Sequence, residues 1–109
     1  MISWEDFEKL DMRTGTIIEA LPFEKAKKPS YKLKIDFGNE GIKYSSAQIT
    51  NLYETNELIG KQIIAVINFP PKRIADFMSE CLVLGVYNKN KDVILLQPER
   101  QTENGNKIG

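Results

Sequence analysis

Two clusters of basic residues carry most of the chemistry that the sequence offers. Residues 25–34 (KAKKPSYKLK) contain five lysines and no acidic residue. Lys72 and Arg73 directly follow a pair of prolines, and Arg13 lies near the start of the chain. Cationic side chains that converge on one surface contact phosphate groups of nucleic acids. Lysines on an exposed strand face are also common in proteins without such a ligand, so the pattern leaves both interpretations open.

Apolar side chains surround the second basic cluster, in the segment NFPPKRIADFMSE (residues 68–80). They are Phe69, Ile74, Phe77 and Met78. Flexible Met and aromatic side chains suit promiscuous apolar contacts, so the same segment fits a binding site for unfolded polypeptide. The two prolines have no amide hydrogen for a strand ladder. We therefore expect them to end a strand and to hold the following residues in an extended, pre-formed loop.

The composition argues against catalysis. Fifteen Lys and Arg residues balance fifteen Asp and Glu residues in the 109-residue chain, so only local clustering can attract nucleic acid. Histidine is absent, which removes the most common general base. No phosphate-binding glycine loop and no metal-ligand spacing occurs. The sequence predicts a protein that is not an enzyme and uses no cofactor or metal, with Cys81 as a buried apolar residue.

The N-terminal sequence MISWEDFEKL is acidic and lacks the basic and apolar blocks of a secretion signal. No apolar run approaches the ~18 residues of a membrane span. These features predict a cytoplasmic protein without membrane insertion.

The elements that must position the basic residues are mostly short strands. Alternation in YKLKIDF (residues 31–37) places Lys32 and Lys34 side by side on the face away from the core. Gly38–Gly41 suggests a hairpin loop, and Gly15 suggests a bulge or a tight bend in the preceding strand. At the rim of a barrel, Tyr31 or Tyr44 could stack on bases beside a phosphate chain.

Three β-rich segments follow a predicted helical turn within residues 47–60, and a short helix that begins at Ser3 precedes the strands. The helix carries Trp4, Phe7 and Leu10 on one side, and we expect it to plug its own barrel; a partner-binding edge is the alternative. The whole pattern predicts an all-β domain over residues 1–109. Its expected form is a five-stranded OB-fold barrel with a short N-terminal helix and one inserted helical turn.

Six motifs occur in order over nearly the whole chain. They are DFEKLDMRTGTI, KLKIDFG, SSAQIT, NFPPKRIADFMSE, VILLQP and NGNKIG. Together they resemble the CsaA-type, export-related chaperones, which belong to the wider family of tRNA-binding domains attached to methionyl-tRNA synthetases. The resemblance implies a non-catalytic homodimer, joined through its terminal segments, that holds unfolded precursor polypeptides before export and has tRNA as a second ligand. A tRNA-binding protein that acts in trans with aminoacyl-tRNA synthetases is the alternative.

The wider family has a basic loop, K-x-R-G-x-x-S-x-G-M, that follows the proline pair and contributes to tRNA binding. Here Arg73 takes the first basic position and Ser79 keeps the serine, whereas Ala75 and Asp76 replace the Arg-Gly pair. The closing Gly-Met pair is replaced as well. Asp76 tolerates a left-handed backbone, so we expect the turn to survive, but its negative charge weakens the case for tRNA binding through this loop.

The basic clusters and the resemblance together define the predicted phosphate-binding residues. They are Arg13, Lys25, Lys28, Lys32, Lys34, Lys72, Arg73 and Ser79. The four apolar residues of segment 68–80 named above are the predicted peptide-binding residues.

Overall fold

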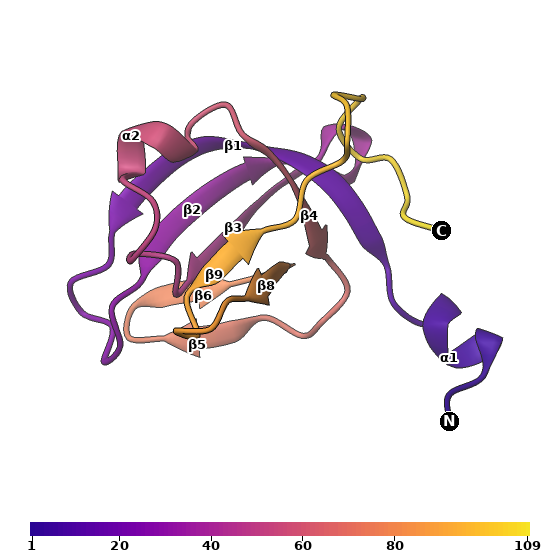
Figure 1. Cartoon of the computed structure of the whole chain (residues 1–109), viewed down its shortest axis with the longest axis horizontal. Coiled ribbons are helices and arrows are strands. Elements are labelled where there is room, and N and C mark those ends of the chain that lie inside the picture. The colour runs from indigo at the N-terminus through magenta and orange to yellow at the C-terminus, as the bar shows by residue number, and fades with distance from the viewer.

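Strands dominate the computed structural model, which describes residues 1–109 (Figure 1). The elements are α1 (Trp4–Glu8), β1 (Met12–Pro22), β2 (Tyr31–Asp36), the 3₁₀ helix η1 (Gly38–Glu40), β3 (Ile42–Ala47), α2 (Thr55–Leu58), β4 (Gln62–Val66), β5 (Lys72–Ile74), β6 (Phe77–Ser79), β7 (Leu82–Val83), β8 (Gly85–Tyr87) and β9 (Val93–Leu95). Five of the strands form one antiparallel sheet in the order β3-β2-β1-β4-β7. The sheet curls into a nearly closed barrel, which confirms the predicted fold class.

A bulge bends β1 so that it can pair with two neighbours. The register with β2 shifts between Ile17 and Glu19, so Ile18 is the extra residue and the bulge predicted at Gly15 was wrong. Gly15 serves close packing instead, because a Cβ atom there would lie 2.6 Å from the ring of Phe37. A bulge increases local strand twist, which helps a short sheet to close.

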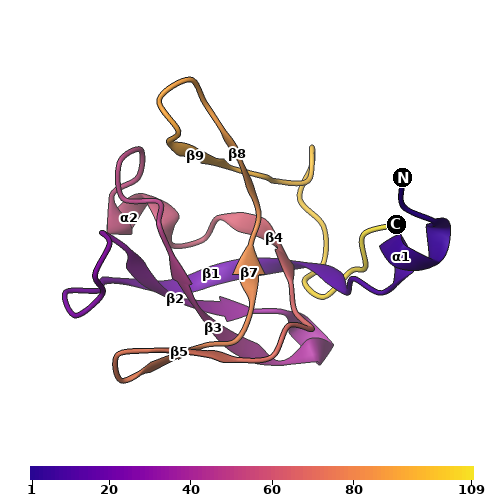
Figure 2. The ribbon, with the colours of Figure 1, turned by 90° about the horizontal axis from the view of Figure 1, so that it is seen from below.

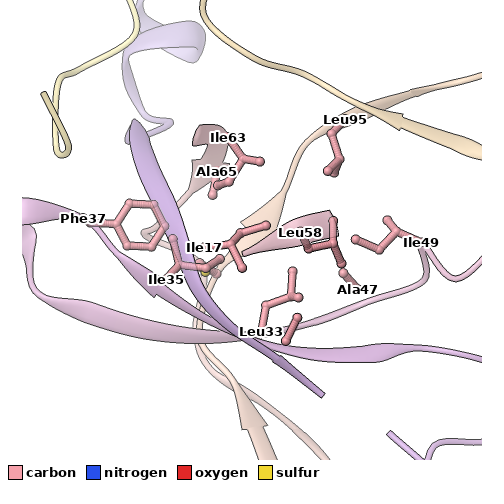
Figure 3. Close-up of a cluster of buried hydrophobic side chains, with 12 residues drawn as sticks. Ile17, Leu33, Ile35, Phe37, Ala47, Ile49, Leu58, Ile63, Ala65 and Leu95 are labelled. Carbon is pink, nitrogen blue, oxygen red and sulfur yellow. The ribbon is translucent and has the colours of Figure 1, made fainter. Parts of the chain in front are cut away.

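The core consists of aliphatic side chains and one aromatic ring inside the barrel (Figure 3). Leu33 and Ile35 are completely buried, so the neighbouring Lys32 and Lys34 lie on the outer face, as the alternation predicts. Each fully buried Leu, Ile or Phe side chain contributes about 1.5–3 kcal/mol relative to exposure. The hydrophobic pattern therefore determines which face of β2 carries its lysines.

Hydrogen bonds join the edge strand β3 to Ser79 and Glu80, which lie just before β7 in the chain, where the barrel closes. The amide of Tyr44 donates to Glu80 Oε1 at 2.9 Å, and the amide of Glu80 donates to the Tyr44 carbonyl at 2.7 Å. The amide of Ser46 donates to Ser79 Oγ at 3.0 Å. These bonds satisfy backbone N–H and C=O groups of β3 that would otherwise remain unpaired at the edge of the sheet.

Residues 72–79 form a two-stranded hairpin, β5–β6, rather than the extended loop that we predicted. Strand β4 ends at Val66, four residues before Pro70, so the prediction that the proline pair ends this strand was wrong. Ala75, not Asp76, takes the left-handed conformation at the turn, with φ of 53°. The predicted helical turn within residues 47–60 is the single turn α2, which ends before Gly60.

Helix α1 does not plug the barrel, so that expectation was wrong. It projects beyond the start of β1, at the end of the molecule where the C-terminus also lies (Figures 1 and 2). The helix has the predicted capping box at Ser3 but no buried residue, and Trp4 is 69% exposed. Five residues are too few to reach back over the barrel.

None of the helices has the length and apolar character needed to cross a membrane.

Candidate functional site

A hollow of about 630 Å³ lies between the β1–β2 loop and the β5–β6 hairpin. We call it the basic hollow, because five cationic side chains and no acidic one line it. They are Lys25, Lys27, Lys28, Lys72 and Arg73. The fold thus brings together the two basic clusters, which are more than forty positions apart in the sequence.

Aromatic packing holds the hairpin against the sheet beside this hollow. The ring of Phe77 lies edge-on to Phe23, with centroids 5.3 Å apart, and to Tyr44, with centroids 6.1 Å apart. Phe23 is buried at the end of β1, so it gives the hairpin a rigid support. Such edge-to-face contacts add to the area that the rings bury.

An exposed ion pair links the two walls of the basic hollow. Lys25 Nζ lies 2.8 Å from Asp76 Oδ2. The hydrogen bond from Lys25 lowers the pKa of Asp76, and the same bond raises the pKa of Lys25, so both groups are charged at neutral pH. None of the remaining four cations of the hollow forms an ion pair. The hollow therefore keeps an uncompensated positive charge that suits a polyanionic ligand.

A second, smaller hollow of about 140 Å³ lies on the outer face of the sheet, and we call it the Tyr44 hollow. Lys32 and Lys34 line it together with Leu21, Tyr44 and Phe77. Lys32 Nζ lies 5.6 Å from the centroid of the Phe23 ring and 6.0 Å from that of Phe77. Both predicted β2 lysines are thus beside the hairpin.

Arg13 lies apart from the other predicted phosphate-binding residues. It is at the start of β1, whereas the lysines of the β1–β2 loop follow the end of that strand, roughly 30 Å away along it. Its guanidinium donates from Nε to Asp11 Oδ1 at 2.7 Å and from Nη1 to the Gly105 carbonyl at 3.0 Å. The Asp11 bond also raises the pKa of Arg13. Asp11, two positions before Arg13, is a local signal for the ion pair, whereas the bond to Gly105 depends on the fold.

Ser79 has a structural contact in this fold. Its hydroxyl oxygen accepts the hydrogen bond from the Ser46 amide that helps to close the barrel. The serine therefore positions the hairpin beside the basic hollow, and its hydroxyl hydrogen remains available to a ligand.

The four predicted peptide-binding residues do not line one common pocket. Phe69 opens into a separate hollow of about 360 Å³, and Ile74 lines the basic hollow. Phe77 lines the Tyr44 hollow, and Met78 is 47% exposed. The hairpin presents apolar side chains in several directions.

A groove that sequence reasoning missed lies where the edge of β3 diverges from β7 and β8. This seam groove has a volume of about 360 Å³, and its lining is mixed. Ser46, Gln48 and Lys91 line it together with apolar residues that include Ala47, Ile49, Val83, Tyr87 and Val93. Tyr87 is 78% exposed at its mouth. Figure 2 shows the hairpin β8–β9 standing away from the sheet. The segment CLVLGVY reads as an ordinary strand, so its sequence contains no signal for a groove.

Cys81 is buried, as predicted. Burial raises the pKa of its thiol to about 12, so the group is neutral at physiological pH. No group of three His, Cys, Asp or Glu side chains is arranged to hold a metal ion.

Comparisons with known proteins agree with this geometry. The family model described as "Putative tRNA binding domain" matches residues 12–107. The structure is similar to chaperone CsaA from Bacillus anthracis strain Ames, with a TM-score of 0.95, 53% identity and coverage of 100% of this chain and 99% of the other. For the CsaA chaperone protein from Picrophilus torridus, the TM-score is 0.94 and the identity 55%, with 100% of each chain covered.

A methionine–tRNA ligase of Methanococcoides burtonii is 37% identical over 105 residues, which cover 96% of this chain but 15% of that protein. The chain therefore spans only a small part of the length of the ligases that it matches. These findings confirm the resemblance predicted from the six motifs. On the evidence of the family match and the barrel that carries it, the chain belongs to the family of tRNA-binding domains.

Proposed function

We propose that the chain is a non-catalytic, export-related chaperone that holds unfolded precursor polypeptides in the cytoplasm. The observation that carries this proposal is the exposed seam groove, in a chain that shares 53–55% identity over its full length with two proteins named as CsaA chaperones. Exposed apolar patches on soluble proteins commonly mark interaction sites. An unfolded polypeptide exposes apolar side chains and has no fixed shape, so it can adapt to such a groove.

Apolar side chains beside the groove extend the surface that a client would contact. Leu82 lines the groove and is exposed, and Val86 and Ile94 are exposed cross-strand partners on the opposite face of β8–β9. The hollow at Phe69 adds a second apolar site beside the proline pair. Several shallow sites suit a holding function, because each contributes a weak and unspecific contact.

The test measures how the protein suppresses aggregation of a chemically reduced, unfolded client. We expect Tyr87→Ser and Val86→Ser to reduce protection, together with Phe77→Ser and Met78→Ser on the hairpin. Ile42→Ser is the matched control, because Ile42 is also exposed but lies at the other end of β3. The proposal fails if the wild-type protein gives no protection or if all variants protect equally well.

We propose tRNA as a second ligand, bound at the basic hollow. The supporting observation is the group of four cations without an ion-pair partner on two adjoining walls. Phosphate contacts dominate the affinity of proteins for nucleic acid and make it dependent on salt. Ser46 and Gln48 line both the basic hollow and the seam groove, so the two ligands would be close neighbours. Action in trans with aminoacyl-tRNA synthetases is the corresponding alternative role.

The tRNA proposal is tested by charge reversal. We expect Lys28→Glu/Lys72→Glu to weaken tRNA binding and to lower the slope of log affinity against log salt by about 1.4–1.8, at about 0.7–0.9 per lost phosphate contact. Lys61→Glu/Lys89→Glu is the control with the same change of charge, because neither lysine forms an ion pair or lines the basic hollow. Equal affinities and slopes in both double variants would reject the basic hollow as the tRNA site.

We also propose a homodimer in which α1 and the C-terminal segment form the contact. Trp4 and Ile2 are exposed apolar side chains at the end of the molecule that holds both termini, and pairing of two copies would cover them (Figure 1). Analytical ultracentrifugation at micromolar concentration should show a dimer that Trp4→Ser weakens. A wild-type monomer under these conditions would contradict the proposal.

A further inference from the structure

We propose that the Tyr44 hollow binds one unpaired pyrimidine base of an RNA, stacked against Tyr44, with Lys32 and Lys34 contacting the adjacent phosphates. This inference rests on the proposed RNA-binding function and specifies which part of an RNA the protein would engage. A site for an unpaired base would select single-stranded loops or ends over continuous duplex.

The register of three neighbouring strands builds this site. On the outer face Lys34 stands between Glu19 of β1 and Tyr44 of β3, and Lys32 is the cross-strand partner of Leu21. Cross-strand neighbours of this kind have Cβ atoms about 4.5–5.5 Å apart. The tyrosine ring is therefore next to an ammonium group, with an apolar side chain and the second lysine in the adjoining row.

Tyr44 is held in place and still open to a ligand. Its amide and carbonyl are both bonded to Glu80, which fixes the backbone that carries the ring. The ring stands at 88° to Phe77, so this contact leaves a face of Tyr44 unstacked, and the residue is 39% exposed. Its hydroxyl has no hydrogen-bond partner within the chain. A pre-positioned aromatic face loses little entropy when a base stacks on it.

Tyr31, the other stacking candidate from the sequence, is not available. Its hydroxyl donates to the Tyr53 carbonyl at 2.7 Å, and its ring packs against the core cluster. The structure thus separates two tyrosines that the sequence presents as equivalent.

The size of the hollow limits the ligand. Its volume is about 140 Å³, close to the cavity of about 150 Å³ that accommodates a single benzene ring in an engineered protein. A single-ring base fits this volume better than a two-ring purine. A base within a duplex is covered on both faces by its neighbours, so it cannot stack on Tyr44.

The charges around the hollow suit an RNA backbone. Neither Lys32 nor Lys34 forms an ion pair, and Lys32 Nζ is held over the rings of Phe23 and Phe77. Glu19 is the one acidic residue in the lining and is the cross-strand neighbour of Lys34 without an ion pair to it, so the two lysines leave the lining with a net positive charge. Two acidic residues lie on the hairpin side: Asp76, which is bonded to Lys25, and Glu80, whose Oε1 accepts a hydrogen bond from the Tyr44 amide at 2.9 Å.

The experiment uses the full-length protein with single-stranded decauridylate that carries one 5-iodouridine, which forms photocrosslinks to stacked aromatic side chains. We expect mass spectrometry to locate the crosslink at Tyr44. Tyr44→Leu should weaken binding of the unmodified decamer about 5- to 150-fold, the factor that corresponds to ~1–3 kcal/mol per stacked base. Tyr44→Phe should keep the affinity, because it retains the ring.

Tyr87→Leu is the matched control, since Tyr87 is an exposed tyrosine in the seam groove. Thermal unfolding followed by circular dichroism checks that each variant is folded. The inference is overturned if Tyr44→Leu binds as well as wild type, if the crosslink lies elsewhere, or if decaadenylate or a duplex binds as tightly as decauridylate.

These outcomes are separable from those of the tRNA test. If tRNA binds through the basic hollow and Tyr44→Leu has wild-type affinity for decauridylate, only the present inference fails. If tRNA does not bind but decauridylate crosslinks to Tyr44, the tRNA proposal fails and the single-strand site stands.

Discussion

The two ends of β1 differ in how they use polar side chains. At its start, Thr14 and Thr16 donate to the Glu103 carbonyl and to Asn104, and Gln62 bonds to the same C-terminal tail. At its end, the β1–β2 loop reaches the hairpin through one exposed ion pair and the packing of Phe23 on Phe77. The start of β1 belongs to a dense network of internal hydrogen bonds, whereas the charged side chains at its end are exposed to solvent.

This difference explains why some cationic side chains of the protein are available to bind a phosphate group and others are not. Arg13 belongs to the network and has both an acid and a carbonyl as hydrogen-bond acceptors. Lys72 and Lys28 belong to the open end and have no acidic partner. A buried or bonded cation would lose its existing contacts on binding a phosphate, so the free lysines bind at lower cost.

The largest effect on stability is expected from Gly15→Ala, within the packed part of β1. A Cβ atom there would lie 2.6 Å from the Phe37 ring and 2.8 Å from Ile35 Cγ2, and both neighbours are completely buried. Overpacking of this kind lowers the free energy of unfolding by about 1–3 kcal/mol. Urea denaturation measures the loss. Gly109→Ala is the control without a neighbour, and equal stability of the two variants would contradict the packing argument.

A somewhat smaller loss is expected from Asn104→Ala, at the network end. Asn104 Oδ1 accepts hydrogen bonds from Thr16 Oγ1 at 2.7 Å and from Gln62 Nε2 at 3.0 Å. Removal of the acceptor leaves the Thr16 hydroxyl without its partner, while Gln62 Nε2 keeps only its bond to the Thr102 carbonyl, and should lower the free energy of unfolding by about 1–2 kcal/mol. Asn39→Ala, at an exposed asparagine of η1, provides the baseline in the same urea titration. If both variants unfold at the same urea concentration, the network does not hold the tail.

At the open end, Asp76→Asn should leave stability nearly unchanged and strengthen tRNA binding severalfold. The substitution removes the negative charge beside the hollow and releases Lys25 from its ion pair. Exposed ion pairs contribute little to folding. Electrophoretic mobility shifts at low and high salt would show a steeper salt dependence than in wild type. Weaker binding would instead mean that the ion pair shapes the site.

The smallest effect is expected for alkylation of Cys81. Its thiol is buried, so the folded protein should react very little. Burial raises the pKa of the thiol from 9.0 to about 12, so iodoacetamide at about pH 8 should label the folded protein only after unfolding. Because the folded state holds this proton more tightly, the contribution to stability is complete below pH 9.0 and falls as the pH rises toward about 12. Rapid labelling in native buffer, measured by mass spectrometry against a urea-unfolded sample, would refute the packing.

Some features could be predicted because they depend on neighbours in the chain. The period-two pattern of β2 identified Leu33 and Ile35 as core residues, and the capping spacing located the start of α1 at Ser3. The hairpin β5–β6 was missed because a proline pair and a basic pair resemble a loop, while its packing against the sheet depends on Phe77. The orientation of α1 was missed because apolar spacing shows which side of a helix is apolar but not what covers it.

Hydrophobic periodicity, glycine placement and composition were sufficient to indicate a small all-β barrel with an outward-facing lysine stripe, since each of these signals acts over a few residues. Contacts between distant segments were needed to show that Arg13 is bonded within the network, that Tyr31 is bound to Tyr53 while Tyr44 is open, and that Lys28 faces Lys72 across one hollow. The physical reason is that the availability of a side chain depends on which partners the fold brings to it, and those partners lie far away in the sequence.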